Sequence, residues 1–270
     1  LLRCLALVLV ILVLARPQTT NKWQNSEIEG IDIMLAIDVS TSMLAEDLKP
    51  NRLEAAKDVA AEFINGRPND NIGITLFAGE TFTQCPLTVD HAVLLDMIHN
   101  IKCGLITDGT AVGMGIANAV TRLKDSKAKS KVIILLTDGT NNKGDISPMT
   151  AAEIAKSFGI RVYTIGVGTN GMAPYPYPVG NTVQYVNMPV EIDEKTLTQI
   201  AGTTDGNYFR ATSNSKLKEV YEEIDKLEKT KLNVKEYSKR DEEYQWFALA
   251  AFLCVLLEVL LRNSILKKIP

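Results

Sequence analysis

The chain has 270 residues, of which 46% are hydrophobic, and its 29 basic residues nearly balance its 32 acidic ones. This length and apolar content are enough to bury a full core, and the near-neutral balance excludes a nucleic-acid binder that works through bulk positive charge. We therefore expect one globular domain with additional segments at its ends, and no nucleic acid among its partners.

The first segment is an apolar run at residues 1–16, LLRCLALVLVILVLAR. Because the sequence begins at Leu1 rather than Met, we interpret this run as a transmembrane helix whose start is cut off. The alternative is a signal peptide with its cleavage site at Val13-Leu14-Ala15.

A second apolar run, residues 244–262, stands near the other end of the sequence. It has the length needed to cross a hydrocarbon core, with Tyr244 and Trp246 at one end and Arg262 at the other, as interfacial anchors would be placed. Its one acidic residue, Glu258, either snorkels to the interface or faces a partner helix. We predict a C-terminal transmembrane helix here.

Between these runs, residues 30–230 alternate between strand-like and helical patterns. The strand-like segments are Ile31–Ile37, Ile72–Phe77, Val132–Leu136 and Val162–Val167, and the helical ones are Arg52–Ile64, Ala92–Ile101, Ala111–Leu123, Thr150–Phe158, Asp193–Ala201 and Asn214–Glu228. Short apolar strands separated by helices favour a mostly parallel sheet covered on both faces. We therefore predict an α/β, Rossmann-like doubly wound domain, joined by a mixed-charge linker at 231–243 to the C-terminal run.

One insertion interrupts this alternation. Residues 172–190 read MAPYPYPVGNTVQYVNMPV, and this Pro-rich, Tyr-bearing segment is either a partner surface or a packed crossover loop. Just before it, GVGTNG at residues 166–171 matches the glycine spacing of dinucleotide sites. The Pro-rich residues that follow cannot open the helix that would hold a pyrophosphate, so we interpret GVGTNG as a turn.

Polar side chains gather where strands end. Asp38, Ser40 and Ser42 follow the first strand, Asp138 follows the strand at Val132–Leu136, and Thr110 precedes a helix. In a doubly wound sheet, ligands bind beyond the carboxyl ends of the strands, so three loops bring these oxygen-bearing side chains to one edge. Such a set suits a hard cation, Mg²⁺ or Mn²⁺, and the absence of a neighbouring His or Cys in the sequence disfavours zinc.

The competing interpretation is that these residues are caps and turns. Ser, Thr and Asp are preferred at helix N-termini, and Thr-Asp-Gly after a strand is commonly a turn. Thr107, three residues before Thr110, is a second candidate for the loop threonine. One such loop would carry little weight, but three loops that fit one architecture favour a metal site.

Together these residues resemble the metal-ion-dependent adhesion site (MIDAS) of the von Willebrand factor type A domain, over roughly residues 30–228. The Asp-x-Ser-x-Ser element is complete in Asp38, Ser40 and Ser42, and GTAVG carries the glycine-threonine pair at Thr110. The resemblance implies that the serine and threonine hydroxyls bind the cation directly or through water, while Asp38 and Asp138 hold it largely through water and hydrogen bonds. An open coordination position then accepts a carboxylate from a partner protein.

Within that superfamily, the chain is similar to bacterial membrane-anchored proteins of the aerotolerance operon, of the BatA type. The likeness lies in ARPQ, AGETFTQCPLT, DGTAVGMGIANAV, GVGTNGMAP and YEEIDKLEKT. It implies a bacterial inner-membrane protein whose partners are sibling Bat proteins and a MoxR-type AAA+ ATPase, with a role in tolerance of oxygen or envelope stress. If residues 1–16 enter from the cytoplasm, the domain lies in the periplasm.

Catalysis is not expected. The sequence has no Gly-x-Ser-x-Gly elbow and no Gly-Lys-Ser/Thr phosphate loop. Asp38-Val39-Ser40 resembles the nucleophile segment of aspartyl-phosphate phosphatases, but those enzymes need a second carboxylate where Ser40 stands. The alternatives left open are a Mg²⁺-dependent phosphatase-like hydrolase, a chelatase-like adaptor that works with an ATPase, and a structural membrane scaffold with a vestigial site.

Overall fold

A computed structural model describes residues 8, 13–14, 18–19, 30–169, 171–179, 182–190, 192–236, 241–242 and 244–264. The chain divides into two compact units. One is Glu27–Leu232, and the other combines Leu1–Ser26 with Asn233–Pro270.

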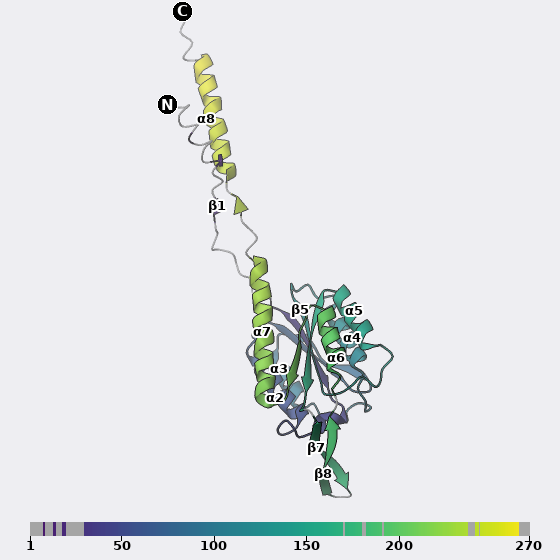
Figure 1. Ribbon diagram of the computed structural model, residues 1–270. Coiled ribbons are helices and arrows are strands. Elements are labelled where there is room, and N and C mark those ends of the chain that lie inside the picture. Colours follow the sequence, from purple (N-terminus) through teal and green to yellow (C-terminus); the bar gives the residue numbers. More distant parts are fainter. Residues whose placement is uncertain are drawn as a thin grey trace, which may run out of the picture. The chain divides into compact units, whose positions relative to one another are not determined.

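The larger unit is built on a six-stranded sheet with the strand order β4-β3-β2-β5-β6-β9 and with helices on both faces (Figure 1). The strands β3, β2, β5, β6 and β9 are parallel, and β4 is antiparallel to β3 at one edge, so the predicted mostly parallel α/β sheet is confirmed. In chain order the elements are β2 (Asp32–Asp38), the 3₁₀ helix η1 (Thr41–Leu44), α2 (Arg52–Asn65), β3 (Asn71–Phe77), β4 (Thr81–Thr88), α3 (His91–His99), α4 (Val112–Leu123), β5 (Lys131–Thr137), α5 (Pro148–Ser157), β6 (Ile160–Val167), β7 (Gly171–Val179), β8 (Thr182–Val190), α6 (Glu194–Thr203), β9 (Tyr208–Ala211) and α7 (Asn214–Glu236).

The central strands are buried on both faces, which explains their continuous apolar sequences. In β2, Ile33 and Leu35 belong to a core shared with α2, α3 and α7, whereas Met34 and Ala36 belong to a core shared with α4, α5 and α6. Successive side chains of a strand point to opposite faces, so a strand packed on both sides needs apolar residues at every position. The parallel strands therefore end at one common edge, where their polar continuations meet.

Two strand-forming regions differ from the sequence prediction. β4 lies at the sheet edge and contains Pro86, which an edge strand tolerates because one side of its backbone makes no ladder bonds. The Pro-rich insertion forms the antiparallel hairpin β7–β8. The side chains of β8 are exposed from Thr182 to Pro189, which favours a partner surface over a packed crossover loop. Gly168 and Gly171 have φ values of 131° and 101°, and the described part of GVGTNG connects the end of β6 to the start of β7, in agreement with the predicted turn.

The smaller unit contains the short antiparallel pair β1 (Gln18–Thr19) and β10 (Asp241–Glu242), and the helix α8 (Tyr244–Ser264). No helix within the described residues combines the length and the apolar content that a membrane crossing requires, so α8 matches the predicted helix at 244–262 without supporting its predicted membrane-spanning role. Most of the predicted N-terminal segment, 1–16, lies outside the described residues. Of the predicted linker, 231–243, positions 237–240 and 243 also lie outside them, and 231–236 continue α7.

Candidate metal centre

The centre begins with Asp38, the last residue of β2. The parallel register places it beside Thr137 at the end of β5, and the Thr137 hydroxyl donates to Asp38 Oδ2 at 2.6 Å. The Ser40 backbone N–H donates to Asp38 Oδ1 at 2.9 Å. Asp38 is completely buried. Oδ2 therefore joins the end of β2 to the end of β5, and Oδ1 fixes the loop that follows β2.

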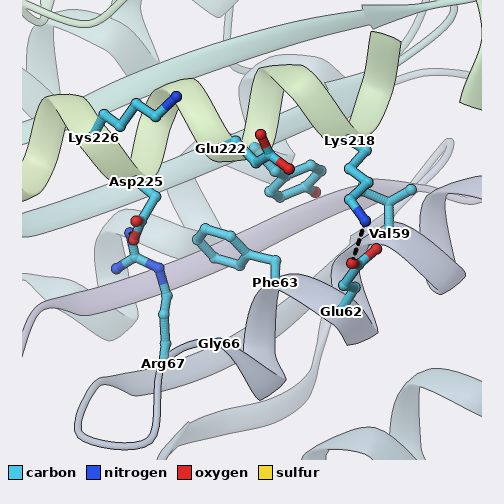
Figure 2. A pocket seen from close by; sticks show the side chains of 10 residues that line it. Val59, Glu62, Phe63, Gly66, Arg67, Lys218, Glu222, Asp225 and Lys226 are labelled. Atoms are coloured by element: carbon cyan, nitrogen blue, oxygen red, sulfur yellow. Dashed lines mark hydrogen bonds and ion pairs between the residues drawn. The ribbon is translucent and has the colours of Figure 1, made fainter. Parts of the chain in front are cut away.

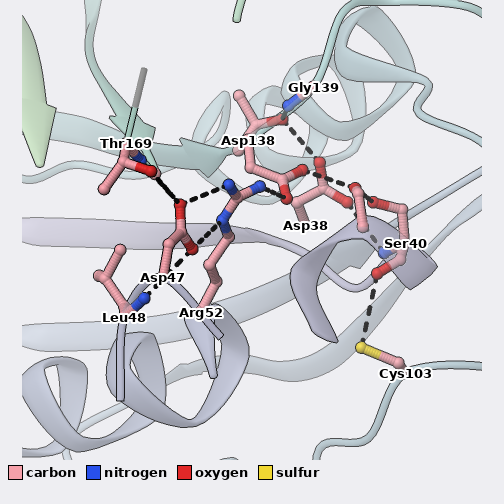
Figure 3. Close-up of polar contacts among 12 residues, drawn as sticks. Asp38, Ser40, Asp47, Leu48, Arg52, Cys103, Asp138, Gly139 and Thr169 are labelled. Carbon is pink, nitrogen blue, oxygen red and sulfur yellow. Dashed lines mark hydrogen bonds and ion pairs between the residues drawn. The ribbon is translucent and has the colours of Figure 1, made fainter. Parts of the chain in front are cut away.

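The two serines connect this carboxylate to the next loop. Ser40 Oγ lies 3.0 Å from Ser42 Oγ, and the Ser42 hydroxyl donates to Asp138 Oδ1 at 2.7 Å. Asp138 directly follows β5, and η1 carries Ser42 toward it. The structure thus brings four of the predicted residues into one hydrogen-bonded cluster at the carboxyl edge of the sheet (Figure 3).

Thr110 reaches the same place from the loop before α4. Its neighbour Gly109 has a φ of 130°, a backbone conformation open to glycine and strained for other residues. The Thr110 N–H donates to Asn142 Oδ1 at 2.9 Å, which fixes the loop against the one after β5. A Cβ at Gly139 would lie only 3.2 Å from Thr110 Oγ1, so the glycine leaves room for the hydroxyl.

The structure distinguishes the two candidate threonines. Thr107 is exposed and its hydroxyl donates to Glu80 at 3.2 Å, whereas Thr110 lines the cleft beside Asp138. Asp108, between them, accepts hydrogen bonds from the Thr41 N–H at 3.0 Å and from the Thr41 hydroxyl at 2.9 Å. This contact holds the Thr110 loop onto η1.

Arg52, at the start of α2, is a buried residue of the centre that the sequence analysis does not identify. Its Nη1 donates to Asp138 Oδ2 at 2.6 Å, and its Nε and Nη2 donate to the two oxygens of Asp47 at 2.7 and 2.6 Å. Asp47 also accepts the Thr169 N–H at 2.7 Å (Figure 3). One guanidinium therefore links the metal-centre carboxylate to the turn that leads into β7.

The carboxylates of the centre are short of positive charge. Burial raises the pKa of Asp38, the charge of Asp138 raises it further, and the hydrogen bonds from Ser40 and Thr137 oppose both. Burial also raises the pKa of Asp138 against the opposing effect of Arg52. Because the one guanidinium of Arg52 is shared between Asp47 and Asp138, and Asp38 accepts from the neutral Ser40 N–H and Thr137 hydroxyl, a divalent cation would stabilise the ionised cluster.

The residues fit a hard cation. Ser42, Thr110 and Asp138 line a cleft of about 470 Å³, and Asp38 and Ser40 lie directly behind them. In the part of the chain that the structure describes, no group of three or more His, Cys, Asp or Glu side chains could hold a metal by itself. A cation here would consequently depend on hydroxyl and carboxylate oxygens, the ligands that Mg²⁺ and Mn²⁺ prefer.

A cysteine does lie close to the centre, contrary to the sequence expectation. Cys103 Sγ donates to the Ser40 carbonyl at 3.4 Å, a contact brought about by the loop after α3. Burial, followed by the charges of Asp38 and Asp138, raises the pKa of the Cys103 thiol to about 12. One thiol does not supply the set of Cys and His ligands typical of zinc sites, so the candidate ligands here remain hydroxyl and carboxylate oxygens.

A second cavity, of about 320 Å³, lies between α2 and α7 (Figure 2). It follows the far end of α2, about 20 Å along the helix from Arg52. Its buried arginine, Arg67, pairs with Asp70 and Asp225, each at 2.6 Å, and stacks over the Phe63 ring at 4.5 Å. Arg67 and its two aspartates form a structural ion-pair cluster, and none of these residues belongs to the predicted metal centre.

Comparison with known proteins places the fold in a family. The sequence-family model of the von Willebrand factor type A domain matches residues 32–223. An aerotolerance-related membrane protein from Bacteroides fragilis, crystallised with multiple mutations to serine, is 34% identical, with a TM-score of 0.63, covering 73% of this chain and 100% of that one. The conserved hypothetical protein BatB from Bacteroides thetaiotaomicron is also 34% identical, with a TM-score of 0.65 over 74% of this chain and 100% of its own.

A more distant solved structure bears on the metal. Proximal thread matrix protein 1 from the mussel byssus, with a zinc-occupied MIDAS motif, is 25% identical, with a TM-score of 0.58 over 73% of this chain and 45% of that one. The family match covers well over half of this chain and includes the strands and loops that build the centre. The chain therefore belongs to the von Willebrand factor type A domain family and is similar to the aerotolerance-related Bat proteins within it.

Proposed function

We propose that this domain is a metal-ion-dependent protein-binding module. The observation that carries the proposal is the convergence of Ser42, Thr110 and Asp138 on one cleft, with Asp38 and Ser40 hydrogen-bonded behind them. Mg²⁺ or Mn²⁺ bound there would supply an electrophilic centre for an acidic side chain of a partner protein. The zinc-occupied MIDAS motif of the mussel protein supports the presence of a metal in a domain of this kind.

Each residue has a distinct part in this function. The neutral hydroxyls of Ser40, Ser42 and Thr110 would hold the cation without cancelling its charge. The two carboxylates are restrained in advance, Asp38 by Thr137 and Ser40, and Asp138 by Ser42 and Arg52, so they need little rearrangement on binding. An ion held largely by neutral ligands keeps more of its attraction for an incoming carboxylate.

No catalytic role is assigned to the centre. A phosphatase mechanism would require an accessible carboxylate nucleophile, but Asp38 is fully buried and both of its oxygens accept hydrogen bonds at 2.6 and 2.9 Å. Position 40, where a second carboxylate would be needed, holds a serine. These observations favour binding over hydrolysis.

The setting that we propose is the bacterial inner membrane, with the domain in the periplasm, and the partners are sibling Bat proteins and a MoxR-type AAA+ ATPase. The support is the similarity to BatB and to an aerotolerance-related membrane protein. Protease added to intact spheroplasts should digest a periplasmic domain. Complete protection, with digestion after lysis, would contradict the orientation.

The binding function is tested by cross-linking capture on the full chain in native membranes, followed by mass spectrometry. With Mg²⁺ present, the wild-type chain and Thr107→Ala should capture the same partners, because Thr107 lies outside the cleft. The double variant Ser40→Ala with Ser42→Ala, or treatment with a chelator, should abolish this capture. Partners that are retained by the folded double variant would contradict a cation-bridged contact.

A further inference from the structure

The β7–β8 hairpin has two edges of different chemical character. It is a two-stranded antiparallel sheet that extends from the body of the domain (Figure 1), and within the described residues no third strand borders it. Residues 171–190 contain no charged side chain. Natural proteins protect exposed strand edges with charges, prolines or bulges, so an uncharged hairpin must use some other protection or be covered by a partner.

The prolines show which backbone groups point outward. All four occupy the same kind of cross-strand pair: Pro174–Asn187, Pro176–Tyr185, Pro178–Val183 and Met172–Pro189. Proline lacks an N–H and cannot take part in a pair that exchanges two hydrogen bonds, so the ladder bonds belong to the alternate pairs. The Pro174 carbonyl accepts the Glu46 N–H at 2.9 Å, which places the polar groups of Pro174 on the outer side of β7.

The two outer edges therefore differ. Along the outer edge of β7, Pro174, Pro176 and Pro178 offer no N–H, so this edge cannot pair with another strand. On β8, the opposite residues of the same pairs, Val183, Tyr185 and Asn187, direct their N–H and C=O groups outward. The hairpin is protected on β7 and open on β8.

The open edge of β8 ends next to the metal-centre cleft, because Met188 directly follows Asn187 and lines that cleft. Met188 of β8 lines this cleft together with Tyr175 and Tyr177 of β7, and across from them lie Ser42 and Asp138. The register pairs Met188 with Ala173, so these side chains share one face of the hairpin.

The base of the hairpin is anchored to the centre. The Thr169 N–H donates to Asp47 at 2.7 Å, and Asp47 pairs with Arg52, which holds Asp138. The Tyr185 side chain hydrogen-bonds to Glu46, next to Asp47. The hairpin is thus positioned as one wall of the metal-centre cleft.

We propose that β8 is a docking edge: an extended segment of a partner protein adds to it as a third strand and places an acidic side chain at the metal centre. The role of the acidic side chain depends on the function proposed above, whereas strand addition is argued from the open edge of β8. Main-chain hydrogen bonds to Val183, Tyr185 and Asn187 give affinity, and Tyr175, Tyr177 and Met188 select apolar neighbours, the pattern of strand-addition recognition.

The occupant is another protein rather than a second copy of this hairpin. Residues 171–190 contain no Asp or Glu, so pairing between two copies of β8 would bring no carboxylate from the hairpin to the metal centre. The segment that fits is extended, alternates apolar residues, and carries one Asp or Glu.

The test uses the full chain and a displayed library of linear peptides of about ten residues, close to the length of a strand, with alternating apolar positions and one Asp or Glu. Peptides enriched in Mg²⁺ are then measured against the wild type, Asn187→Pro and Asn187→Ala. The proline removes an outward N–H, whereas the alanine removes only the side chain. A second series methylates the peptide's own amide nitrogens one at a time, which leaves the protein unchanged and does not depend on the folding of the proline variant.

We expect Asn187→Pro to weaken binding at least about tenfold, Asn187→Ala to leave it within about twofold, and N-methylation to weaken it at alternate amides only. Failure to enrich any peptide, equal binding to Asn187→Pro, or tolerance of methylation at every amide would overturn strand addition. Dimerisation of the chain that Asn187→Pro abolishes would also overturn the proposal, in favour of a second copy. Peptide binding that is lost in Asn187→Pro but unaffected by a chelator would support the docking edge and contradict the metal-bridged function.

Discussion

Replacing Arg52 with methionine removes the guanidinium that pairs with two buried carboxylates of the metal centre, Asp47 and Asp138. The Arg52 side chain is 3% exposed, and its partners Asp47 and Asp138 are 4% and 0% exposed. Methionine keeps much of the packing volume but leaves both carboxylates without a counter-ion. The chain should therefore become less stable and more dependent on a bound divalent cation.

The size of the effect follows from burial. Removing one partner of a buried ion pair costs about 3–5 kcal/mol, because an uncompensated charge remains in the interior. Domains are stable by about 5–15 kcal/mol, so Arg52→Met should still fold. A cation at a hundred times its dissociation constant stabilises the folded state by about 2.7 kcal/mol. The added stabilisation should be larger in Arg52→Met than in the wild type, because less of the negative charge is already neutralised.

The assay is urea unfolding at neutral pH, in chelator and in excess Mg²⁺, with Arg67→Met as the matched control. Arg67 is also a buried arginine between two aspartates, Asp70 and Asp225, but it lies at the far end of α2 (Figure 2). Arg67→Met should lose stability without any extra response to metal. A metal response in Arg52→Met no larger than in Arg67→Met or the wild type would refute the reasoning.

Further predictions concern the loop threonine, the core and pH. Thr110→Ala should weaken Mg²⁺ binding measured by calorimetry, whereas Thr107→Ala should leave it unchanged; equal effects would contradict the placement of Thr110. Ile134→Ala, in the buried strand β5, should cost about 2–5 kcal/mol of unfolding free energy without changing metal affinity. Despite its burial, hydrogen bonds from Arg52 lower the pKa of Asp47 from 3.8 to about 2. Asp47 therefore stabilises the fold above its unfolded pKa, by up to about 2 kcal/mol, and this stabilisation should disappear as pH falls from 5 to about 2. Unfolding curves of the wild type and Asp47→Asn should converge over that range, and a constant difference would contradict this assignment.

The sheet and its helices could be predicted because their signals are local. The central strands are apolar at successive positions, and Asn51, Asp90, Ser147 and Asp193 cap the helices that follow them, each accepting a hydrogen bond from a backbone N–H. The hairpin gave the opposite signal, since proline normally argues against a strand. Its prolines are tolerated because all of them fall at positions that make no ladder bond.

The candidate residues of the metal centre could also be placed from the sequence, because three strand-end loops of a parallel sheet must meet at one edge. Arg52 could not, since its burial depends on carboxylates from residues 47 and 138 and leaves no trace in the local pattern. This matters for one expectation. Repulsion between neighbouring carboxylates would by itself make Asp138→Ala neutral or stabilising in the metal-free domain, but the substitution would leave Arg52 Nη1 without its 2.6 Å acceptor. We now expect a loss of about 1–3 kcal/mol, limited because Asp47 still pairs with Arg52.

The most direct test of the metal centre is calorimetric titration of Mg²⁺ and Mn²⁺ into the metal-stripped full chain and into the double variant Ser40→Ala with Ser42→Ala. The account predicts saturable binding to a single site in the wild type, and loss of that binding in a double variant whose circular dichroism shows an intact fold. No binding at millimolar metal to the folded wild type, or the same affinity in both proteins, would contradict the central claim that these loops form a cation site.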